Sequence, residues 1–164
     1  SKEKFQKGWL GGLPETPCGY GSKLESTKPQ RRLIPRLISK YGIKTIADIG
    51  AGDMNWIAHT DLCGASYTPF DLVPRHPSVK EFDIVRQVPE RFDMIMCLWV
   101  LNHLPFDDCQ SAIKNLRASG AKYLLITERE RYKADSPPEA YMDCIESLKL
   151  NEKNDFIKLV ALNG

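Results

Sequence analysis

A chain of 164 residues has the length of one domain and can bury a hydrophobic core without disulfides or metals. Hydrophobic residues make up 42% of the chain and charged residues 27%, which excludes a disordered, fibrous or membrane-embedded class and favours a soluble globular protein. The formal net charge of +2 is too small to indicate a nucleic-acid partner by itself, although such a partner stays possible.

The sequence carries no membrane or export signal. No run approaches the ~18 apolar residues needed to cross a bilayer, and Ser1 to Phe5 lack the apolar core of a secretion signal. The five cysteines are widely spaced and include no Cys-x-x-Cys pair, which is typical of reduced structural thiols rather than of a disulfide framework or a zinc site. We therefore expect a cytoplasmic protein with no membrane contact and no bound metal.

Residues 1–26 are predicted to form an irregular arm. Glycine is frequent there, and Pro14 and Pro17 interrupt regular structure. An arm of this kind can fold across a neighbouring pocket as a lid. Residues 27–164 are predicted to form a single domain.

The domain opens with a predicted helix. Ser26 or Thr27 can cap it, Pro29 suits its first turn, and Gly42 ends it. Apolar residues recur at helical spacing on one face, at Leu33, Ile34, Leu37, Ile38 and Tyr41. The opposite face is basic and carries Arg31, Arg32, Arg36 and Lys40. Such a face can meet phosphates, but a charged helix surface is usually only solvated.

Four short runs predict strands, of which the last two are expected to be buried. They comprise Thr45 to Ile49, Tyr67 to Phe70, Met94 to Leu101 and Tyr123 to Ile126. The third run is too uniformly apolar for a strand with one wet face, and such runs are typical of central parallel strands. A helix is predicted between the last two runs, over Asp107 to Ala118, with Gly120 after it.

The remaining elements complete an alternating pattern. A helix is predicted from Pro137 to Leu148 and a last strand from Phe156 to Leu162. Strands that alternate with helices indicate a parallel sheet with helices on both faces. Only 11 residues separate Asp71 from Asp83, fewer than a parallel crossover usually needs. The sheet edge near Val79 to Ile84 is therefore predicted to be reduced, with little or no flanking helix.

The main chemical signal is a glycine bend that follows the first predicted strand. Gly50 and Gly52 let the backbone approach a ligand closely, because a side chain on either glycine would occupy the ligand's space. Asp71 follows Gly52 by 19 residues and ends the next strand, where a carboxylate can accept hydrogen bonds from both ribose hydroxyls. The bend alone is explained equally well as an ordinary tight turn. The added acids Asp48, Asp71 and Asp83 favour a nucleoside site.

A dinucleotide is a poor fit to this bend. The third glycine of the usual dinucleotide pattern is replaced by Asn55, and Asp53 would place a carboxylate where a phosphate must lie. We therefore expect a ligand with a cationic or zwitterionic end rather than NAD.

The stretch from Gly19 to Thr127 resembles class I S-adenosylmethionine-dependent methyltransferases. Asp48-Ile49-Gly50-Ala51-Gly52 looks like their cofactor loop, Asp71 like their ribose-binding acid, and Phe82-Asp83-Ile84 like the segment that borders the adenine. Phe92 to Leu104, with its His-Leu pair, is similar to their fourth strand and the turn after it. The resemblance implies S-adenosyl-L-methionine as the cofactor.

Three shorter stretches resemble, more narrowly, a poorly characterised group of small bacterial and phage-type methyltransferases. They are Gly19 to Ser22, Gly52 to Trp56 and Ser119 to Leu125. This resemblance implies an α/β, Rossmann-like methyltransferase fold with helices on both faces of a mostly parallel seven-stranded sheet. The implied strand order is 3-2-1-4-5-7-6, with a reduced third-strand edge and a final hairpin over Leu148 to Leu162.

The cofactor contacts that the resemblance implies surround the glycine bend and the ends of the predicted strands. They comprise Asp48, Gly50, Ala51, Gly52, Asn55, Trp56, Asp71, Leu72, Asp83, Ile84, Leu98 and Trp99. Trp56 and Trp99 can cover the adenine or methionine end, although core packing is the better explanation for at least one of them. Tyr20 and Arg31 reach the cofactor if the arm closes as a lid.

His103 is the predicted catalytic residue. Transfer of a sulfonium methyl requires a nucleophile held in line and, for some acceptors, a group that takes a proton. An imidazole has an ordinary pKa near ~6.5, and His103 follows a central strand, where ligands of open α/β sheets bind. The sequence is equally compatible with a histidine that only hydrogen-bonds the backbone and shapes the pocket.

The residues after the fourth strand narrow the choice of acceptor. Leu101 to Leu104 replaces both the Asp/Asn/Ser-Pro-Pro-Tyr motif of DNA amino-methyltransferases and the Pro-Cys nucleophile of cytosine C5 enzymes. The predicted domain also leaves no room for a separate target-recognition domain. We therefore predict a small-molecule acceptor, or a modified nucleobase presented as one. A non-catalytic S-adenosylmethionine-binding module and a nucleic-acid methyltransferase stay open as alternatives, and the oligomeric state is not predicted.

Overall fold

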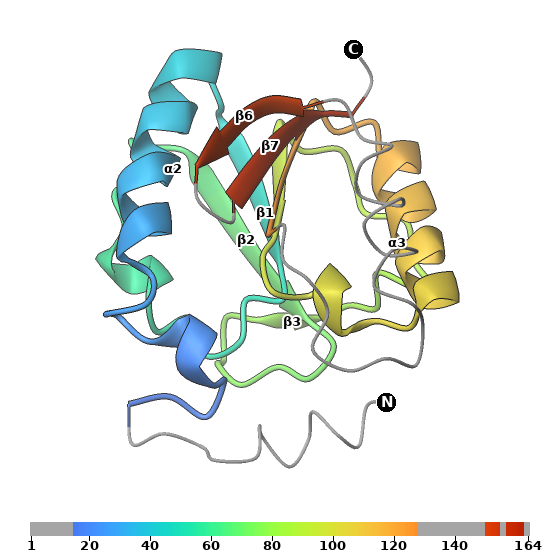
Figure 1. The fold of residues 1–164 in the computed structure, drawn as a ribbon, viewed down its shortest axis with the longest axis horizontal. Coiled ribbons are helices and arrows are strands. Elements are labelled where there is room, and N and C mark those ends of the chain that lie inside the picture. Colours follow the sequence, from blue (N-terminus) through green and yellow to red (C-terminus); the bar gives the residue numbers. More distant parts are fainter. Residues whose placement is uncertain (1–14, 128–149, 155–156, 163–164) are drawn as a thin grey trace.

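In the computed structural model, which describes residues 15–127, 150–154 and 157–162, a central sheet lies between two helices (Figure 1). The helical elements are η1 (Tyr20–Ser22), α2 (Lys28–Tyr41), η2 (Ile57–His59), η3 (Leu101–His103) and α3 (Phe106–Ala118). The strands are β1 (Thr45–Ile49), β2 (Ser66–Asp71), β3 (Lys80–Glu81), β4 (Met94–Cys97), β5 (Tyr123–Thr127), β6 (Leu150–Asn154) and β7 (Ile157–Ala161).

The sheet has seven strands in the order β3-β2-β1-β4-β5-β7-β6. Strands β1 to β5 pair in parallel, whereas β7 runs antiparallel to both β5 and β6. The predicted strand order and the predicted hairpin are therefore confirmed. The helix predicted from Pro137 to Leu148 lies outside the described residues.

The third-strand edge is reduced, as the short link between Asp71 and Asp83 predicts. β3 contains two exposed residues, and its register with β2 covers only Phe70 with Lys80 and Asp71 with Glu81. No helix lies between β2 and β3 in this described stretch. A chain this short reaches the next parallel position only as an irregular loop.

Both faces of the sheet are buried, each under one of the two long helices in the described part of the chain. Ile46, Met94 and Met96 pack with the apolar face of α2, whereas Ala47 and Ile95 pack with α3 on the other side. Side chains alternate between the two faces along a strand, so a strand buried on both sides must be apolar at every position. This explains the uniformly apolar runs, and Figure 1 shows α2 and α3 on opposite sides of the sheet.

Helix α2 has the predicted boundaries but not the predicted cap. Thr27 occupies the N-cap position, yet its hydroxyl donates to the Lys23 carbonyl at 2.8 Å and no side chain caps the helix. Pro29 lies in the first turn, where its missing N–H is harmless. Gly42 ends the helix with φ of 61°, the left-handed conformation that glycine adopts without a steric penalty.

The strand predicted over Met94 to Leu101 is shorter than its apolar run. β4 ends at Cys97, because Trp99 takes a φ of 59° and Leu101 begins η3. Leu98 and Leu101 remain buried, so burial rather than strand structure explains their apolar character. Because β4 ends early, residues 98–104 lie beyond the carboxyl end of this strand.

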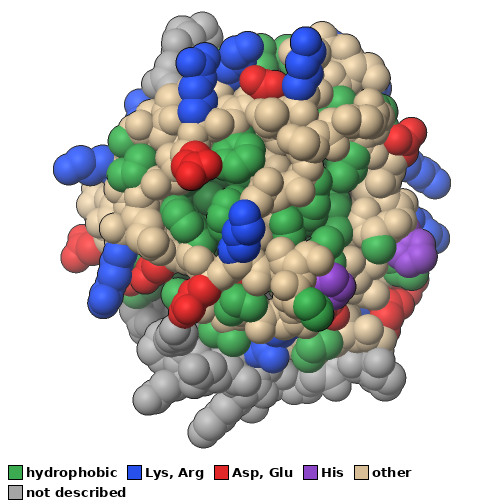
Figure 2. Space-filling view, turned by 180° about the vertical axis from the view of Figure 1, so that it is seen from behind, with side chains coloured by type: hydrophobic (Ala, Val, Ile, Leu, Met, Phe, Trp, Pro, Cys, Tyr) green, Lys and Arg blue, Asp and Glu red, His purple; other side chains and the backbone are tan. Residues whose placement is uncertain are grey.

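The surface seen in Figure 2 carries basic and acidic side chains interspersed around a central hollow lined by hydrophobic side chains. None of the described helices is both long and apolar enough to span a membrane. Cys18, Cys63, Cys97 and Cys109 have free thiols, and Cys144 lies outside the described residues. Within the described ranges, His, Cys, Asp and Glu side chains form no cluster that could hold a metal ion.

Candidate functional site

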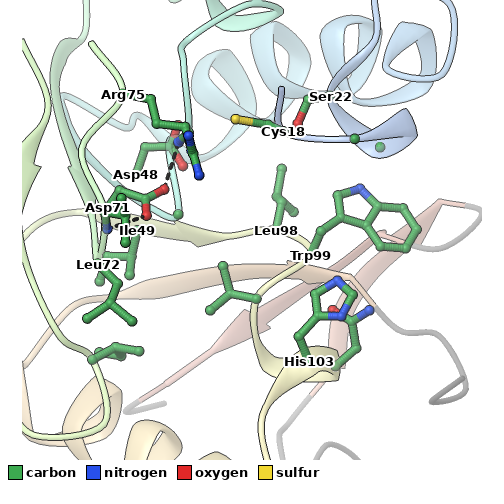
Figure 3. A pocket seen from close by; sticks show the side chains of 18 of the residues that line it. Cys18, Ser22, Asp48, Ile49, Asp71, Leu72, Arg75, Leu98, Trp99 and His103 are labelled. Carbon is green, nitrogen blue, oxygen red and sulfur yellow. Dashed lines mark hydrogen bonds between the residues drawn. The ribbon is translucent and has the colours of Figure 1, made fainter. Parts of the chain in front are cut away.

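A cavity of about 620 Å³ opens at the carboxyl ends of β1, β2 and β4, where ligands of open α/β sheets bind. Its volume lies within the range of small-molecule sites, about 300–1,000 Å³. Figure 3 shows Cys18 and Ser22, from the segment before α2, facing the strand ends across this cavity. The lining residues are Pro17, Cys18, Gly19, Tyr20, Gly21, Ser22, Ser26, Asp48, Ile49, Gly50, Gly52, Trp56, Asp71, Leu72, Val73, Arg75, Phe82, Asp83, Ile84, Val85, Leu98, Trp99, Val100, Asn102, His103 and Leu104.

Two features require glycine at Gly50 and Gly52 in the bend after β1: the backbone conformation and the nearby side chains. Gly50 has φ of 93° and Gly52 has φ of 60°, values that side chains rarely adopt. A Cβ at Gly50 would lie 2.3 Å from Cγ2 of Val100, and one at Gly52 would lie 2.9 Å from Sγ of Cys18. Val100 and Cys18 therefore exclude side chains here in addition to the predicted reason, close approach of a ligand, which stays a prediction.

Asp71 is fixed at the end of β2 by two backbone amides. Its Oδ2 accepts a hydrogen bond from the Gly52 N–H at 2.8 Å, and its Oδ1 accepts one from the Val73 N–H at 3.0 Å. Each carboxylate oxygen has two lone pairs, so both oxygens keep capacity for a further donor. The side chain lines the cavity in a set orientation and can receive two donors from a ligand.

Asp48 is the most deeply buried acid of the site. It is 3% exposed, and its Oδ2 accepts a hydrogen bond of 2.5 Å from the Tyr67 hydroxyl. Burial raises the pKa of Asp48 to about 7, the Tyr67 hydrogen bond opposes this shift, and the Asp71 charge adds to it. Burial and the same carboxylate also raise the pKa of Tyr67. Near neutral pH, Asp48 can therefore gain or lose a proton in response to a charged ligand.

Asp83 lies at the third-strand edge, where irregular structure holds it. Its Oδ1 accepts a hydrogen bond from the Val85 N–H at 3.0 Å, while its own N–H donates to Oε1 of Gln87 at 2.7 Å. Arg86 lies 3.8 Å from its Oδ2 in an exposed ion pair. Asp83 and the buried Ile84 both line the cavity, so an acid and an apolar surface adjoin there.

The turn after β4 forms the opposite end of the cavity. Trp99 has a φ of 59°, an outlier for a bulky residue, and its N–H donates to the Thr127 hydroxyl at 2.8 Å. This turn brings Leu98, Trp99 and His103 into the cavity wall. Figure 3 shows Trp99 and His103 on one side and Asp48, Asp71 and Arg75 on the other, with Leu98 between them.

The segment before α2 is tied to the glycine loop by hydrogen bonds. Nδ2 of Asn55 donates to Oε2 of Glu15 at 3.0 Å and to the Ser22 carbonyl at 2.9 Å. The Thr16 hydroxyl donates to Oδ2 of Asp53 at 2.7 Å. The Asp53 carboxylate is thus turned toward this segment and does not line the cavity, contrary to its predicted place beside the ligand.

The arm also contributes directly to the cavity wall. Cys18, Tyr20 and Ser22 line the cavity, and Tyr20 is 64% exposed. Burial and the Asp53 charge raise the pKa of the Cys18 thiol, so it stays protonated at neutral pH. Arg31 does not reach the cavity, because its guanidinium donates to the Leu24 carbonyl at 2.5 Å.

Most of the predicted site residues line this one cavity. They comprise His103 with Asp48, Gly50, Gly52, Trp56, Asp71, Leu72, Asp83, Ile84, Leu98 and Trp99. Ala51 and Asn55 do not line the cavity. Ala51 is buried, and its N–H donates a hydrogen bond to the Phe70 carbonyl. The Asn55 side chain donates instead to the Ser22 carbonyl, in the segment before α2. Sequence reasoning missed Arg75 and Asn102. Arg75 lies within the irregular loop between β2 and β3, which carries no motif, whereas Asn102 could have been noticed as a polar residue directly after an apolar run.

Comparisons with proteins of known structure identify the fold. No protein-family model and no curated protein sequence matches the chain. The pyocyanin biosynthetic protein PhzM is similar in structure, with a TM-score of 0.59 at 15% identity, over 84% of this chain and 56% of PhzM. This chain therefore spans little more than half the length of PhzM.

Two further solved structures align over most of both chains. The N-methyltransferase NodS from Bradyrhizobium japonicum WM9, in complex with S-adenosyl-L-homocysteine, gives a TM-score of 0.58 at 19% identity, over 80% of this chain and 83% of NodS. Magnesium protoporphyrin IX methyltransferase from Synechocystis PCC 6803, with bound S-adenosylmethionine, gives 0.55 at 11% identity, over 97% of this chain and 88% of that one. The chain thus has the Rossmann-like fold of class I methyltransferases.

Proposed function

We propose that this protein is an S-adenosylmethionine-dependent methyltransferase whose acceptor is a small molecule, or a modified nucleobase presented as one. The observation that carries the proposal is the Asp71 carboxylate, which is fixed on the Gly52 N–H at the mouth of a cavity of small-molecule size. The S-adenosylhomocysteine complex of NodS and the S-adenosylmethionine complex of the Synechocystis enzyme, which share the fold, support it.

The residues of the cavity fit an adenosine bearing a cationic end. Asp71 has free lone pairs for both hydroxyls of a ribose, and Asp83 with Ile84 offers an acid and an apolar surface for an adenine. Asp48 lies beside them with a carboxyl that a nearby positive charge would keep ionised. Three carboxyl groups in one wall disfavour the pyrophosphate of a dinucleotide, in agreement with the sequence.

Methyl transfer requires the protein mainly to position the reacting groups. S-adenosylmethionine supplies, when bound, a methyl group on an electrophilic sulfonium. The protein's own task is to hold a nucleophile in line, exclude water and, where the acceptor requires it, take a proton. His103 lines the end of the cavity opposite the acids and is proposed for the proton-accepting role.

The alternative of a nucleic-acid methyltransferase has less support from the protein surface. Basic and acidic side chains are interspersed on the face seen in Figure 2, whereas nucleic-acid sites usually carry clustered basic residues. Arg31 of the basic helix face is engaged with the Leu24 carbonyl. The narrower likeness to small bacterial and phage-type methyltransferases stays a prediction.

The proposal is tested by incubating the protein with methyl-tritiated S-adenosylmethionine and a cell extract separated into small-molecule, nucleic-acid and protein fractions. We expect label in the small-molecule fraction, and we expect less of it with Asp71→Ala when the cofactor concentration is below saturation. Label in the nucleic-acid fraction would favour the nucleic-acid methyltransferase. Cofactor binding without any labelled product would favour the non-catalytic module.

A further inference from the structure

Tyr20 presents an accessible aromatic ring beside the cavity. It lines the cavity and is 64% exposed. Among the described residues, the other exposed large apolar side chain is Val88, which does not line the cavity. An exposed ring gains free energy when a ligand covers it, because apolar surface is then removed from water. A ligand that enters this cavity can therefore contact the ring directly.

The turn that carries Tyr20 is held by hydrogen bonds, so the exposed ring does not result from a loose backbone. The Ser22 N–H donates to the Gly19 carbonyl at 3.0 Å, and the Lys23 N–H donates to the Tyr20 carbonyl at 3.1 Å. The Ser26 hydroxyl donates to the same Tyr20 carbonyl. A ring on an ordered turn loses little conformational freedom when a ligand binds to it.

This turn lies at the end of the cavity that Trp99 forms. A Cβ at Gly21 would lie 3.5 Å from Cδ1 of Trp99, so the η1 backbone packs against the indole. Trp99 and His103 lie across the cavity from Asp48 and Asp71 (Figure 3). Tyr20 therefore lies on a turn that is packed at the end away from these acids.

The two ends of the cavity differ in charge. We call Asp48, Asp71 and Asp83 the acidic end, and Tyr20, Trp99 and His103 the aromatic end. Every Asp or Glu among the residues that line the cavity belongs to the acidic end. Under the proposed function the acidic end takes the adenosine, which leaves the aromatic end to the methyl acceptor.

Lys23 adds a positive charge beside the Tyr20 ring. Its Nζ lies 5.7 Å from the ring centroid, and the side chain is half-buried. Among the described residues, no acid is in ion-pair contact with Lys23. The nearby Glu15 carboxylate accepts instead from the Leu24 N–H at 2.9 Å and from Asn55. One turn thus offers an accessible ring together with a cation that no described acid neutralises.

We infer that the methyl acceptor is a flat aromatic anion, whose ring contacts Tyr20 and whose carboxylate or phenolate oxygen lies near Lys23. Aromatic rings attract one another beyond the effect of buried area, and the absence of acids at this end leaves the charge of Lys23 available to an anion. This inference rests on the proposed function, because the place of the acceptor follows from that of the cofactor.

The test is a titration with three probes at pH 7 in the presence of saturating S-adenosylhomocysteine, followed by saturation-transfer NMR. Naphthalene-2-carboxylate carries both the ring and the charge. Naphthalene-2-methanol keeps the ring without the charge, and decahydronaphthalene-2-carboxylate keeps the charge without the aromatic ring. We expect the wild type to bind naphthalene-2-carboxylate about threefold or more tightly than either analogue. The preference over the alcohol should shrink at high salt, whereas the preference for the aromatic ring should not.

Two variants separate the ring from the charge. Tyr20→Leu keeps apolar surface but removes the ring, so it should lose the preference over the decahydro analogue and retain the preference over the alcohol. Lys23→Gln should show the reverse. Tyr20→Phe keeps the ring and should retain both preferences. These side chains lie on an exposed turn, so we expect all three variants to fold.

Lys40 provides a matched control in the same molecule. Its Nζ lies 5.4 Å from the centroid of the Tyr41 ring, which repeats the arrangement of Lys23 and Tyr20, but neither residue lines the cavity. Lys40→Gln removes one positive charge from the surface, as Lys23→Gln does. It should leave the relative affinities of the three probes unchanged.

Four results would overturn the inference: no preference in the wild type, preferences that survive in Tyr20→Leu and Lys23→Gln, an equal loss in Lys40→Gln, or no binding of naphthalene-2-carboxylate at millimolar concentration. S-adenosylhomocysteine binding is measured separately by calorimetry. A Tyr20→Leu variant that loses S-adenosylhomocysteine as strongly as the probe would assign the ring to the cofactor and would also overturn the inference. Failure of the proposed function, in which the wild type does not bind S-adenosylhomocysteine, is therefore distinguishable from failure of the acceptor assignment alone.

Discussion

The hydroxyl of Tyr67 on β2 donates a hydrogen bond of 2.5 Å to Oδ2 of Asp48 on the neighbouring β1. The pair connects the deepest acid of the cavity to the strand that ends in Asp71. The hydrogen bond favours the charged carboxylate, but burial outweighs it and raises the pKa of Asp48 to about 7. The protonation state of the site therefore changes near neutral pH.

We predict that Asp48 makes the folded protein less stable as the pH rises. The pKa of Asp48 is about 7 in the folded state and 3.8 in the unfolded state, so protonation of Asp48 favours folding at low pH. This contribution to the free energy of unfolding is complete below about pH 4 and is lost as the pH rises to about 7. The change should be on the order of 4 kcal/mol, because one pKa unit corresponds to about 1.4 kcal/mol. Urea denaturation of the wild type and Asp48→Asn across this range measures it. A difference between the two proteins that stays constant with pH would contradict the prediction.

Tyr67→Phe should move this titration to higher pH. Among the described residues, Tyr67 is the one whose interaction favours the charged form of Asp48, and the variant removes that interaction. The carboxyl pKa should then lie above about 7, as followed by ¹³C NMR of labelled aspartate. An unchanged or lower pKa would show that the hydrogen bond does not act on this carboxyl in solution.

Gly50→Ala should destabilise the fold for two separable reasons. The new Cβ would meet Val100 at 2.3 Å, and φ of 93° is strained for alanine. We expect a loss of about 1–3 kcal/mol, the scale of overpacking and of backbone strain. Val100→Ala in the same chain should restore the steric part only. Full restoration, or none, in denaturant titrations would show that one of the two causes is absent.

Asn55→Ala should loosen the arm without changing the cavity wall. The variant removes the hydrogen bonds from Nδ2 to Glu15 and to the Ser22 carbonyl, which hold the arm against the glycine loop. We expect S-adenosylhomocysteine to dissociate several-fold faster in stopped-flow experiments, since Cys18, Tyr20 and Ser22 of this segment line the cavity. Glu15→Gln keeps an acceptor oxygen and should show a smaller effect. Equal dissociation rates in all three proteins would mean that the arm does not retain the ligand.

The layers and the reduced edge were predictable from local patterns in the sequence, whereas the sheet order was predicted only through the resemblance to class I methyltransferases. Uniform runs such as Met94 to Cys97 report burial on two faces, and the link from Asp71 to Asp83 is too short for a crossover helix. The end of β4 was not predictable. An apolar sequence shows burial but not the backbone turn at Trp99 that ends the strand.

Site residues at the ends of the strands were predictable. Site residues brought in from segments far apart in the sequence were not. Asp71 and Gly52 belong to a pattern of fixed spacing, so their meeting in one site was predicted, although the hydrogen bond between them was not. Asn55 lies in that same loop but turns toward Glu15, 40 positions earlier in the chain, and no local pattern encodes that contact. Arg75 and Asn102 entered the wall in the same way, through the tertiary fold.

The most direct test of the central claim is a calorimetric titration of the protein with S-adenosylhomocysteine, with NAD as the comparison ligand. We predict saturable binding of S-adenosylhomocysteine alone, weakened by about 1–3 kcal/mol in Asp71→Ala, the scale of hydrogen bonds to a charged group. Asp71→Asn, which can keep the bond to the Gly52 N–H, should fall between the two. The absence of heat with S-adenosylhomocysteine, or an affinity unchanged in Asp71→Ala, would contradict the assignment of this cavity.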